Sequence, residues 1–106
     1  MKILLAVDGS EYTARMLDYL GAHKEWSSAG HAFTVFHAVL PVPHRAAAFA
    51  HKVGHPADEI ASFAEHGKFD LVIMGSRGQG ALTNLVLGSV AMKVLARCAV
   101  PVLLVR

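Results

Sequence analysis

The chain has 106 residues, 54% of them hydrophobic and 17% charged, which suits one globular domain spanning residues 1–106 and excludes long disorder. Its formal charge of +2 comes with no run of Lys or Arg, and its apolar runs are too short to span a bilayer, so neither nucleic acid nor a membrane is an expected partner. The single cysteine, Cys98, rules out an internal disulfide and favours a reducing cytoplasm.

The N-terminal segment predicts a buried strand, a turn and a helix. Residues 3–7 form a continuous apolar run, which is typical of a strand that is buried on both faces of a parallel sheet. Because this run starts near Met1, we expect no signal peptide. Asp8-Gly9-Ser10 predicts a turn, and Ser10 or Asp8 could cap a helix over residues 11–23. The apolar spacing predicts that this helix buries Ala14, Leu17, Leu20 and Gly21.

A second strand is predicted over residues 32–39, and the connection after it is unusually short. Pro41 and Pro43 end the strand, residues 45–50 could form a short helix, and residues 51–53 could form a strand. A parallel crossover needs about a dozen or more residues, usually a full helix. Either the helix was deleted and a partner subunit covers the sheet face, or the sequence joins two pieces of a longer chain near residues 49–51. We favour the second interpretation.

The C-terminal half predicts helices and strands in regular alternation. Pro56 and two acidic residues start a helix that buries Ile60, Phe63 and Ala64 and ends at Gly67. Strands follow over residues 69–74 and 101–105, with a helix over 89–97 between them. The expected fold is α/β, with an open, mainly parallel, five-stranded sheet in a Rossmann-like three-layer arrangement whose helix after the second strand is shortened or missing.

The segment GSRGQGALTNLVLGS, residues 75–89, suggests either a plain connecting loop or an anion site. Ligands of open parallel sheets bind beyond the carboxyl ends of the strands, where Asp8, the segment after Val39 and Gly75 would meet. Gly75 and Gly78 lack a Cβ atom, so their amides can approach an anion. At the second part of the site, Gly88 and Ser89 begin a helix whose free amides favour phosphate. The spacing matches neither GxxxxGK[ST] nor GxGxxG.

The chain resembles the universal stress proteins over nearly its whole length. In the nucleotide-binding branch of that family, the pattern is Gly, two residues, Gly, nine residues, Gly, then Ser or Thr. Gly75, Gly78, Gly88 and Ser89 fit this pattern without a gap. The segments KILLAVDGSE, GHPADEI, FDLVIMGSRG and GSVAMKVLARCAVPVLLVR resemble further parts of the family. Most of the long helix that follows the second strand in the family has no counterpart here.

The resemblance implies a binding site for ATP, or for AMP or ADP, with Mg²⁺. Asp8 would lie beside the ribose or the phosphate-bound metal, because a carboxylate near phosphates needs a bridging cation. The remaining positions would border the adenine (Ala38, Val39), border the site (Met74), hold ribose and phosphates (Gly75, Arg77, Gly78) and bind the far phosphates (Gly88, Ser89, Val90).

Plainer roles stay open for several of these residues. Asp8 could simply cap a helix, and Arg77 could be a solvated loop cation. His51 and His55 are four residues apart, but Gly54 and Pro56 argue against a helical metal site. Cys98 is read as a small apolar residue.

The sequence thus predicts a cytoplasmic, nucleotide-responsive stress regulator that forms a homodimer through its C-terminal strand. We expect no catalytic residue and at most weak ATP hydrolysis, since no general base is evident and no spaced His/Asp set makes Ser10 or Ser89 a nucleophile. The alternatives are a slow ATPase and a dimerising scaffold that binds no nucleotide.

Overall fold

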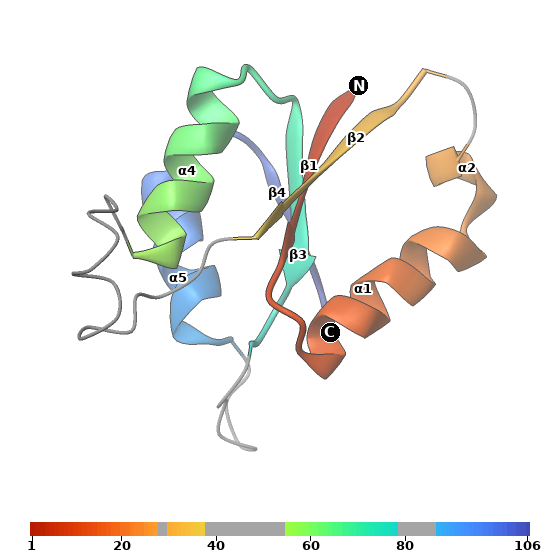
Figure 1. Ribbon diagram of the computed structural model, residues 1–106, viewed down its shortest axis with the longest axis horizontal. Coiled ribbons are helices and arrows are strands. Elements are labelled where there is room, and N and C mark those ends of the chain that lie inside the picture. The colour runs from red at the N-terminus through yellow and green to blue at the C-terminus, as the bar shows by residue number, and fades with distance from the viewer. Residues whose placement is uncertain (28–29, 38–54, 79–86) are drawn as a thin grey trace, which may run out of the picture.

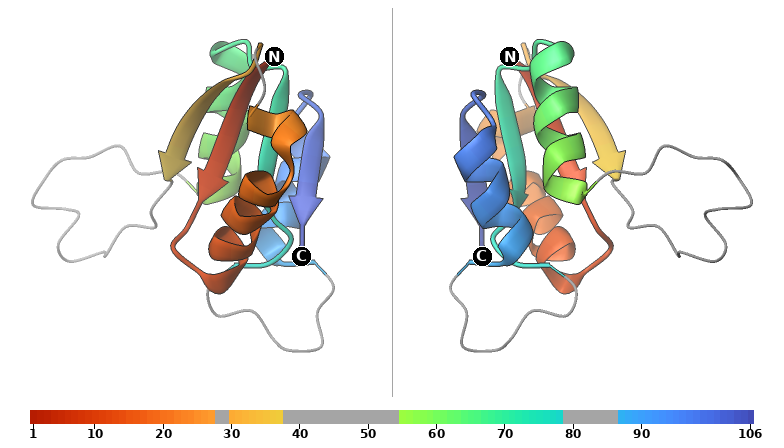
Figure 2. Two further views of the ribbon diagram at one scale, coloured as in Figure 1. Left: turned by 90° about the vertical axis from the view of Figure 1, so that its right-hand side faces the viewer. Right: turned by 90° about the vertical axis from the view of Figure 1, so that its left-hand side faces the viewer.

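The computed structural model describes residues 1–27, 30–37, 55–78 and 87–106 of the chain. Within these residues, four strands form one parallel sheet in the order β2-β1-β3-β4 (Figure 2). The strands are β1 (Lys2–Val7), β2 (Ala32–His37), β3 (Leu71–Gly75) and β4 (Val102–Val105). The predicted α/β class and the open parallel sheet are confirmed. The predicted fifth strand over residues 51–53 and the short crossover before it lie outside the described residues.

Helices cover both faces of this sheet and produce the predicted three layers. α1 (Glu11–Ala22) and the short α2 (Lys24–Ser27) lie on one face, whereas α4 (Pro56–His66) and α5 (Ser89–Arg97) lie side by side on the other (Figure 1). No helix in the described parts of the chain is long and apolar enough to cross a membrane.

The helix ends form largely where the sequence predicts them. Ser10 is the N-cap of α1, and its Oγ accepts a hydrogen bond from the Thr13 amide. Pro56 occupies the first turn of α4, as expected. Gly67 ends α4 with a φ of −78°, so it is not needed for a left-handed backbone. A Cβ atom on Gly67 would lie 2.5 Å from the Phe69 ring, so the lack of a side chain serves close packing instead.

The prediction of the buried face of α1 is wrong, because a different side of the helix faces the sheet. Tyr12 and Met16 are its buried residues, and Leu20 is half-buried, whereas Leu17 is 46% exposed and Ala14 and Gly21 are also exposed. The helix itself forms as predicted, but apolar residues occur on more than one of its sides. The buried side carries Tyr12 and Met16 because α1 packs against β3 and β4. Met16 there belongs to one buried cluster with Ile3 and Ile73.

The prediction for α4 is correct for Ile60 and Ala64, which are buried, and wrong for Phe63, which is 40% exposed. Phe63 stacks on Phe36 of the edge strand β2, with the two ring centroids 4.6 Å apart. Its ring therefore covers the margin of the sheet, where one side stays open to solvent.

Two hydrophobic clusters hold the layers together. Leu4, Val72 and Val94 belong to the cluster between the sheet and helices α4 and α5. Ile3 and Met16 belong to the cluster between the sheet and α1. The carboxyl ends of all four strands lie at one edge of the sheet, because all strands run in the same direction.

Candidate functional site

The candidate site lies at this carboxyl edge, where segments far apart in the sequence meet. Backbone hydrogen bonds join three of them: the Ser76 amide donates to the Val105 carbonyl at 2.8 Å, and the Gly88 amide donates to the Ser76 carbonyl at 2.8 Å. The end of β3, the end of β4 and the start of α5 are thereby fixed together. Ser76 is buried, and its backbone takes part in both bonds: its amide donates one and its carbonyl accepts the other. No pattern in the sequence around Ser76 predicts this role.

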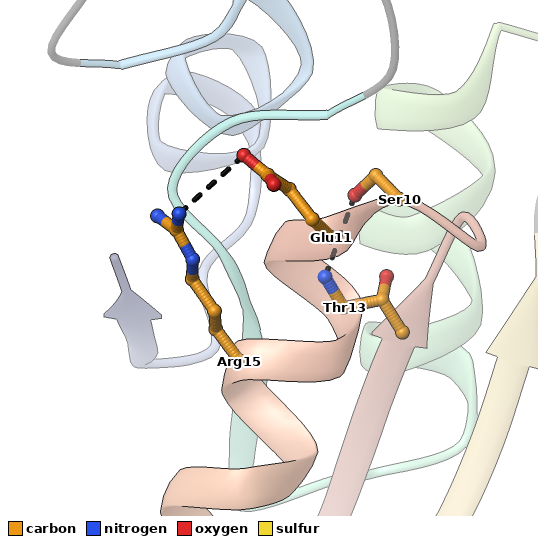
Figure 3. A network of polar contacts seen from close by, with 4 residues as sticks. All are labelled: Ser10, Glu11, Thr13 and Arg15. Carbon is orange, nitrogen blue, oxygen red and sulfur yellow. Dashed lines mark hydrogen bonds and ion pairs between the residues drawn. The ribbon is translucent and has the colours of Figure 1, made fainter.

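Asp8 follows β1 and is held by the turn that starts α1. Its Oδ1 accepts hydrogen bonds from the Ser10 amide and from the Thr13 hydroxyl, both at 2.9 Å, and its own amide donates to the Thr13 Oγ1 at 3.0 Å. Ser10 rather than Asp8 caps the helix (Figure 3). The carboxylate of Asp8 therefore has a fixed orientation at the carboxyl edge of the sheet.

Each of the three spaced glycines packs closely against other protein atoms. A Cβ atom on Gly78 would lie 2.5 Å from Oδ2 of Asp8, and one on Gly75 would lie 2.8 Å from the Cβ of Tyr12. A Cβ atom on Gly88 would lie 3.2 Å from the Cα of Arg77. Contacts this short exclude a side chain at Gly75 and Gly78 unless neighbouring atoms move. The glycine pattern thus draws Asp8, Arg77 and the start of α5 into one compact region.

Arg77 contacts the aromatic ring of Tyr12, a residue outside the predicted site. Its guanidinium carbon lies over the Tyr12 ring, 4.6 Å from the ring centroid, and that of Arg15 lies 4.8 Å from the same centroid. Arg15 also pairs with Glu11 across 3.4 Å on the outer side of the first turn (Figure 3). Arg77 is therefore more than a solvated loop cation. A signal in the sequence is the position of Tyr12 in the first turn after Asp8.

The start of α5 offers backbone donors. Its N-cap, Gly88, makes no side-chain capping bond, and the first turn contains no acidic residue. The first bond of the helix runs from the Met92 amide to the Gly88 carbonyl, so the amides of Ser89 and Val90 precede the helical bonding pattern. Together with the positive end of the helix dipole, these amides favour an anion.

The other predicted site residues divide into two groups. Met74 is buried in the cluster beneath α5, and Val90 is half-buried against that cluster. Ala38 and Val39, which the resemblance places beside adenine, lie outside the described residues, as does His51.

The donor set at this edge fits Mg²⁺ only together with a phosphate ligand. Among the described residues, no group of three His, Cys, Asp or Glu side chains could hold a metal ion. Asp8 can supply a carboxylate oxygen, and Mg²⁺ commonly combines one or two carboxylates with phosphate oxygens and water. These residues would therefore hold the metal through the nucleotide rather than by themselves.

Comparisons with known proteins agree with this architecture. A Thermus aquaticus relative, named "Universal stress protein in QAH/OAS sulfhydrylase 3'region", is 36% identical over 135 aligned positions, which cover 98% of this chain and 97% of that protein. The aligned length exceeds the 106 residues of this chain, so the relative carries additional residues opposite gaps in this chain.

Solved structures share the fold. The structure of hypothetical protein MJ0577, from Methanocaldococcus jannaschii, superposes with a TM-score of 0.81 at 24% identity and covers 98% of this chain and 94% of that chain. A universal stress protein in complex with cAMP superposes with a TM-score of 0.69 at 25% identity, covering 100% of this chain and 96% of that one. The model of the universal stress protein family matches residues 43–106. The chain belongs to the universal stress protein family.

Proposed function

We propose that this protein binds an adenine nucleotide, ATP or else ADP or AMP, together with Mg²⁺, and acts as a nucleotide-responsive stress regulator. The observation that carries the proposal is the meeting of Arg77, the start of α5 with its glycine N-cap, and the carboxylate of Asp8 at one edge of a parallel sheet. A cation and backbone amides suit phosphates, and a lone carboxylate suits a phosphate-bound metal. The relative that was solved with cAMP supports an adenine nucleotide as the ligand class.

In this proposal the two sides of the site have different tasks. Arg77 and the amides of Ser89 and Val90 would neutralise the phosphates, and Asp8 would take the ribose or the Mg²⁺ that the phosphates carry. Gly75, Gly78 and Gly88 let these groups come close to one another. Met74 would support the site from below, and Ala38 and Val39 would border the base. Mg²⁺ would screen the phosphates from Asp8 when the nucleotide is bound.

Binding is tested best by the melting temperature and by calorimetry with ATP, ADP and AMP, each with and without Mg²⁺. A ligand at about 100 times its dissociation constant adds roughly 2.7 kcal/mol to the free energy of unfolding. Replacing Arg77 with Gln should weaken ATP binding more than AMP binding, because AMP carries fewer phosphate charges for the Arg77 guanidinium to neutralise. Lys93→Gln is the matched control, since Lys93 is an exposed cation of α5.

The alternatives make distinct predictions in the same assays. If millimolar ATP, ADP and AMP all leave the melting temperature unchanged, the protein is a scaffold without nucleotide and the proposal is wrong. A slow ATPase would bind ATP and release phosphate over many turnovers, which an ATP-hydrolysis assay measures directly. We expect binding with at most weak hydrolysis.

Self-association through β4 remains part of the proposal. β4 is an edge strand of the described sheet, and its backbone beyond β3 could pair with a second copy. We expect a homodimer by analytical ultracentrifugation at micromolar concentration, and a monomer for Leu104→Pro, because proline cannot donate to an added strand. A monomeric wild-type protein would contradict the dimer. The cytoplasmic location inferred from the lone cysteine also stays a prediction.

A further inference from the structure

We propose that Tyr12 is a positioning residue of this site, and that its ring places the guanidinium group of Arg77 before any ligand arrives. This inference rests on the proposed nucleotide binding and adds a residue that the glycine pattern does not contain. Its basis is the position of the guanidinium carbon over the ring, 4.6 Å from the centroid. At this distance the electron-rich face of an aromatic ring attracts a cation.

The Tyr12 ring is a rigid support. Tyr12 is only 8% exposed, and its backbone and Cβ approach Gly75 so closely that a methyl group there would lie 2.8 Å from the Tyr12 Cβ. Gly75 therefore allows α1 to pack tightly on the end of β3. This contact fixes the backbone and Cβ of Tyr12, and the burial of the side chain leaves the ring little room to follow a movement of the arginine.

The same helical turn also orients the acidic side of the site. Thr13, the next residue along α1, donates its hydroxyl hydrogen to Asp8 and accepts a hydrogen bond from the Asp8 amide. Consecutive residues of α1 thus contact the cation and the anion of the site. The Oδ2 of Asp8 lies next to Gly78, which follows Arg77 in the chain. The spacing between the two charges therefore depends on the first turn of α1 as well as on the glycine loop.

The aromatic contact lowers the cost of binding. An arginine side chain that must be ordered by its ligand loses rotamer freedom when the ligand binds, whereas one already held in place loses less. Arg15 lies over the same ring but also pairs with Glu11 and is half exposed. Tyr12 acts through its ring and not through its hydroxyl in this role. Phenylalanine at this position should therefore still hold the Arg77 guanidinium, whereas leucine should not.

The central experiment compares Tyr12→Phe with Tyr12→Leu by calorimetric titration with ATP and Mg²⁺, each also in an Arg77→Gln background. We expect Tyr12→Phe to bind ATP like the wild type and Tyr12→Leu to lose roughly two- to fivefold in affinity, the range of an exposed cation–π contact. In the Arg77→Gln background the same leucine substitution should change the affinity by less than about twofold. Tyr19→Leu is the matched control, because Tyr19 also lies on α1 but its ring contacts that of His23 instead.

A second measurement needs no nucleotide, and it does not depend on whether the Tyr12→Leu variant folds. In the NMR spectrum of the wild-type protein, the side-chain protons of Arg77 should be shifted upfield by the Tyr12 ring, and Tyr12→Phe should keep that shift. Unshifted Arg77 protons would overturn the inference, as would an equal loss of ATP affinity on Tyr12→Leu with and without Arg77. If Tyr12→Leu leaves the ATP affinity unchanged, the positioning role of Tyr12 is wrong, but the proposed nucleotide binding stands. Failure of the wild-type protein to bind any of the three nucleotides overturns the proposed function and this role with it.

Discussion

The two faces of the sheet differ in how completely they are covered. On the side of α4 and α5, buried side chains from both helices pack on Leu4 and Val72. On the side of α1, the register places Phe33 beside Ile3 and Val35 beside Leu5. Ile3 and Leu5 are buried, yet Phe33 is 39% and Val35 is 65% exposed. In the described part of the chain, the α1 side thus leaves the β2 half of its apolar surface open to solvent.

This difference indicates that the two helical layers are attached by different means. α4 and α5 are held mainly by apolar burial, which is not directional. α1 has a smaller buried cluster, but its first turn is tied to the end of β1 by Asp8 and Thr13 and packs closely on Gly75. The face with less apolar burial is the one that orients the charged residues of the candidate site.

The largest expected effect is a loss of stability on the well-covered face. Ile60→Ala removes a buried side chain of α4 and should lower the free energy of unfolding by about 2–5 kcal/mol. Val35→Thr, on the open face, should change it by less than about 0.5 kcal/mol. Urea denaturation of both variants measures the contrast. Equal losses would mean that Val35 is covered in solution and that the comparison of the two faces is wrong.

A smaller effect should follow from a methyl group between α1 and β3. Gly75→Ala places a Cβ atom 2.8 Å from that of Tyr12 and should cost about 1–3 kcal/mol of stability, because either α1 or the loop must shift. Gly21→Ala is the control: nothing lies within 4 Å of its added methyl group, and alanine should stabilise α1 by about 0.5–1 kcal/mol. Thermal melts of both variants suffice. A neutral Gly75→Ala would show that the contact with Tyr12 is not tight.

The polar attachment of α1 can be tested through its threonine. Thr13→Val keeps the shape of the side chain but removes the bonds to Asp8, and should lower stability by about 1–2 kcal/mol. It should also weaken the Mg²⁺ dependence of ATP binding, because the carboxylate of Asp8 loses its fixed orientation. Thr13→Ser restores the hydroxyl and should recover both properties. If Thr13→Ser recovers neither the stability nor the Mg²⁺ dependence, the effect of Thr13→Val comes from packing and not from the lost hydrogen bonds.

The smallest expected effect concerns Cys98, which packs at the margin of the well-covered face. Burial raises the pKa of the Cys98 thiol above its ordinary value, outweighing a hydrogen bond with the Val100 backbone, and the charge of Glu65 adds to the rise. The folded state therefore holds this proton more tightly than the unfolded chain. The stability it contributes is present below the ordinary thiol pKa and is lost as the pH rises through the raised value.

Alkylation by iodoacetamide measures this property. The rate should rise with pH around a midpoint above that of the same protein unfolded in urea, because only the thiolate reacts. A folded-state midpoint at or below the unfolded one would contradict the burial of Cys98.

Much of the fold could be read from local patterns. Continuous apolar runs indicated β1 and β3, because strands buried on both faces need apolar side chains throughout. Ser10, Pro56 and Gly88 marked helix starts, since capping and a fixed proline φ act within a few residues. The spacing of the glycines indicated a site at the edge of the sheet.

What the sequence by itself determined was therefore the class of fold and the family resemblance, and it predicts the sheet edge at which the candidate site would lie. Only the tertiary structure decided which side of α1 is buried, that Arg77 lies over the Tyr12 ring, and that Thr13 hydrogen-bonds to Asp8. Periodicity states how often apolar residues recur along a helix but not where that helix sits on its sheet. A contact between a loop arginine and a helix 65 residues earlier in the chain depends on the packing of β3 against α1, which no local pattern encodes.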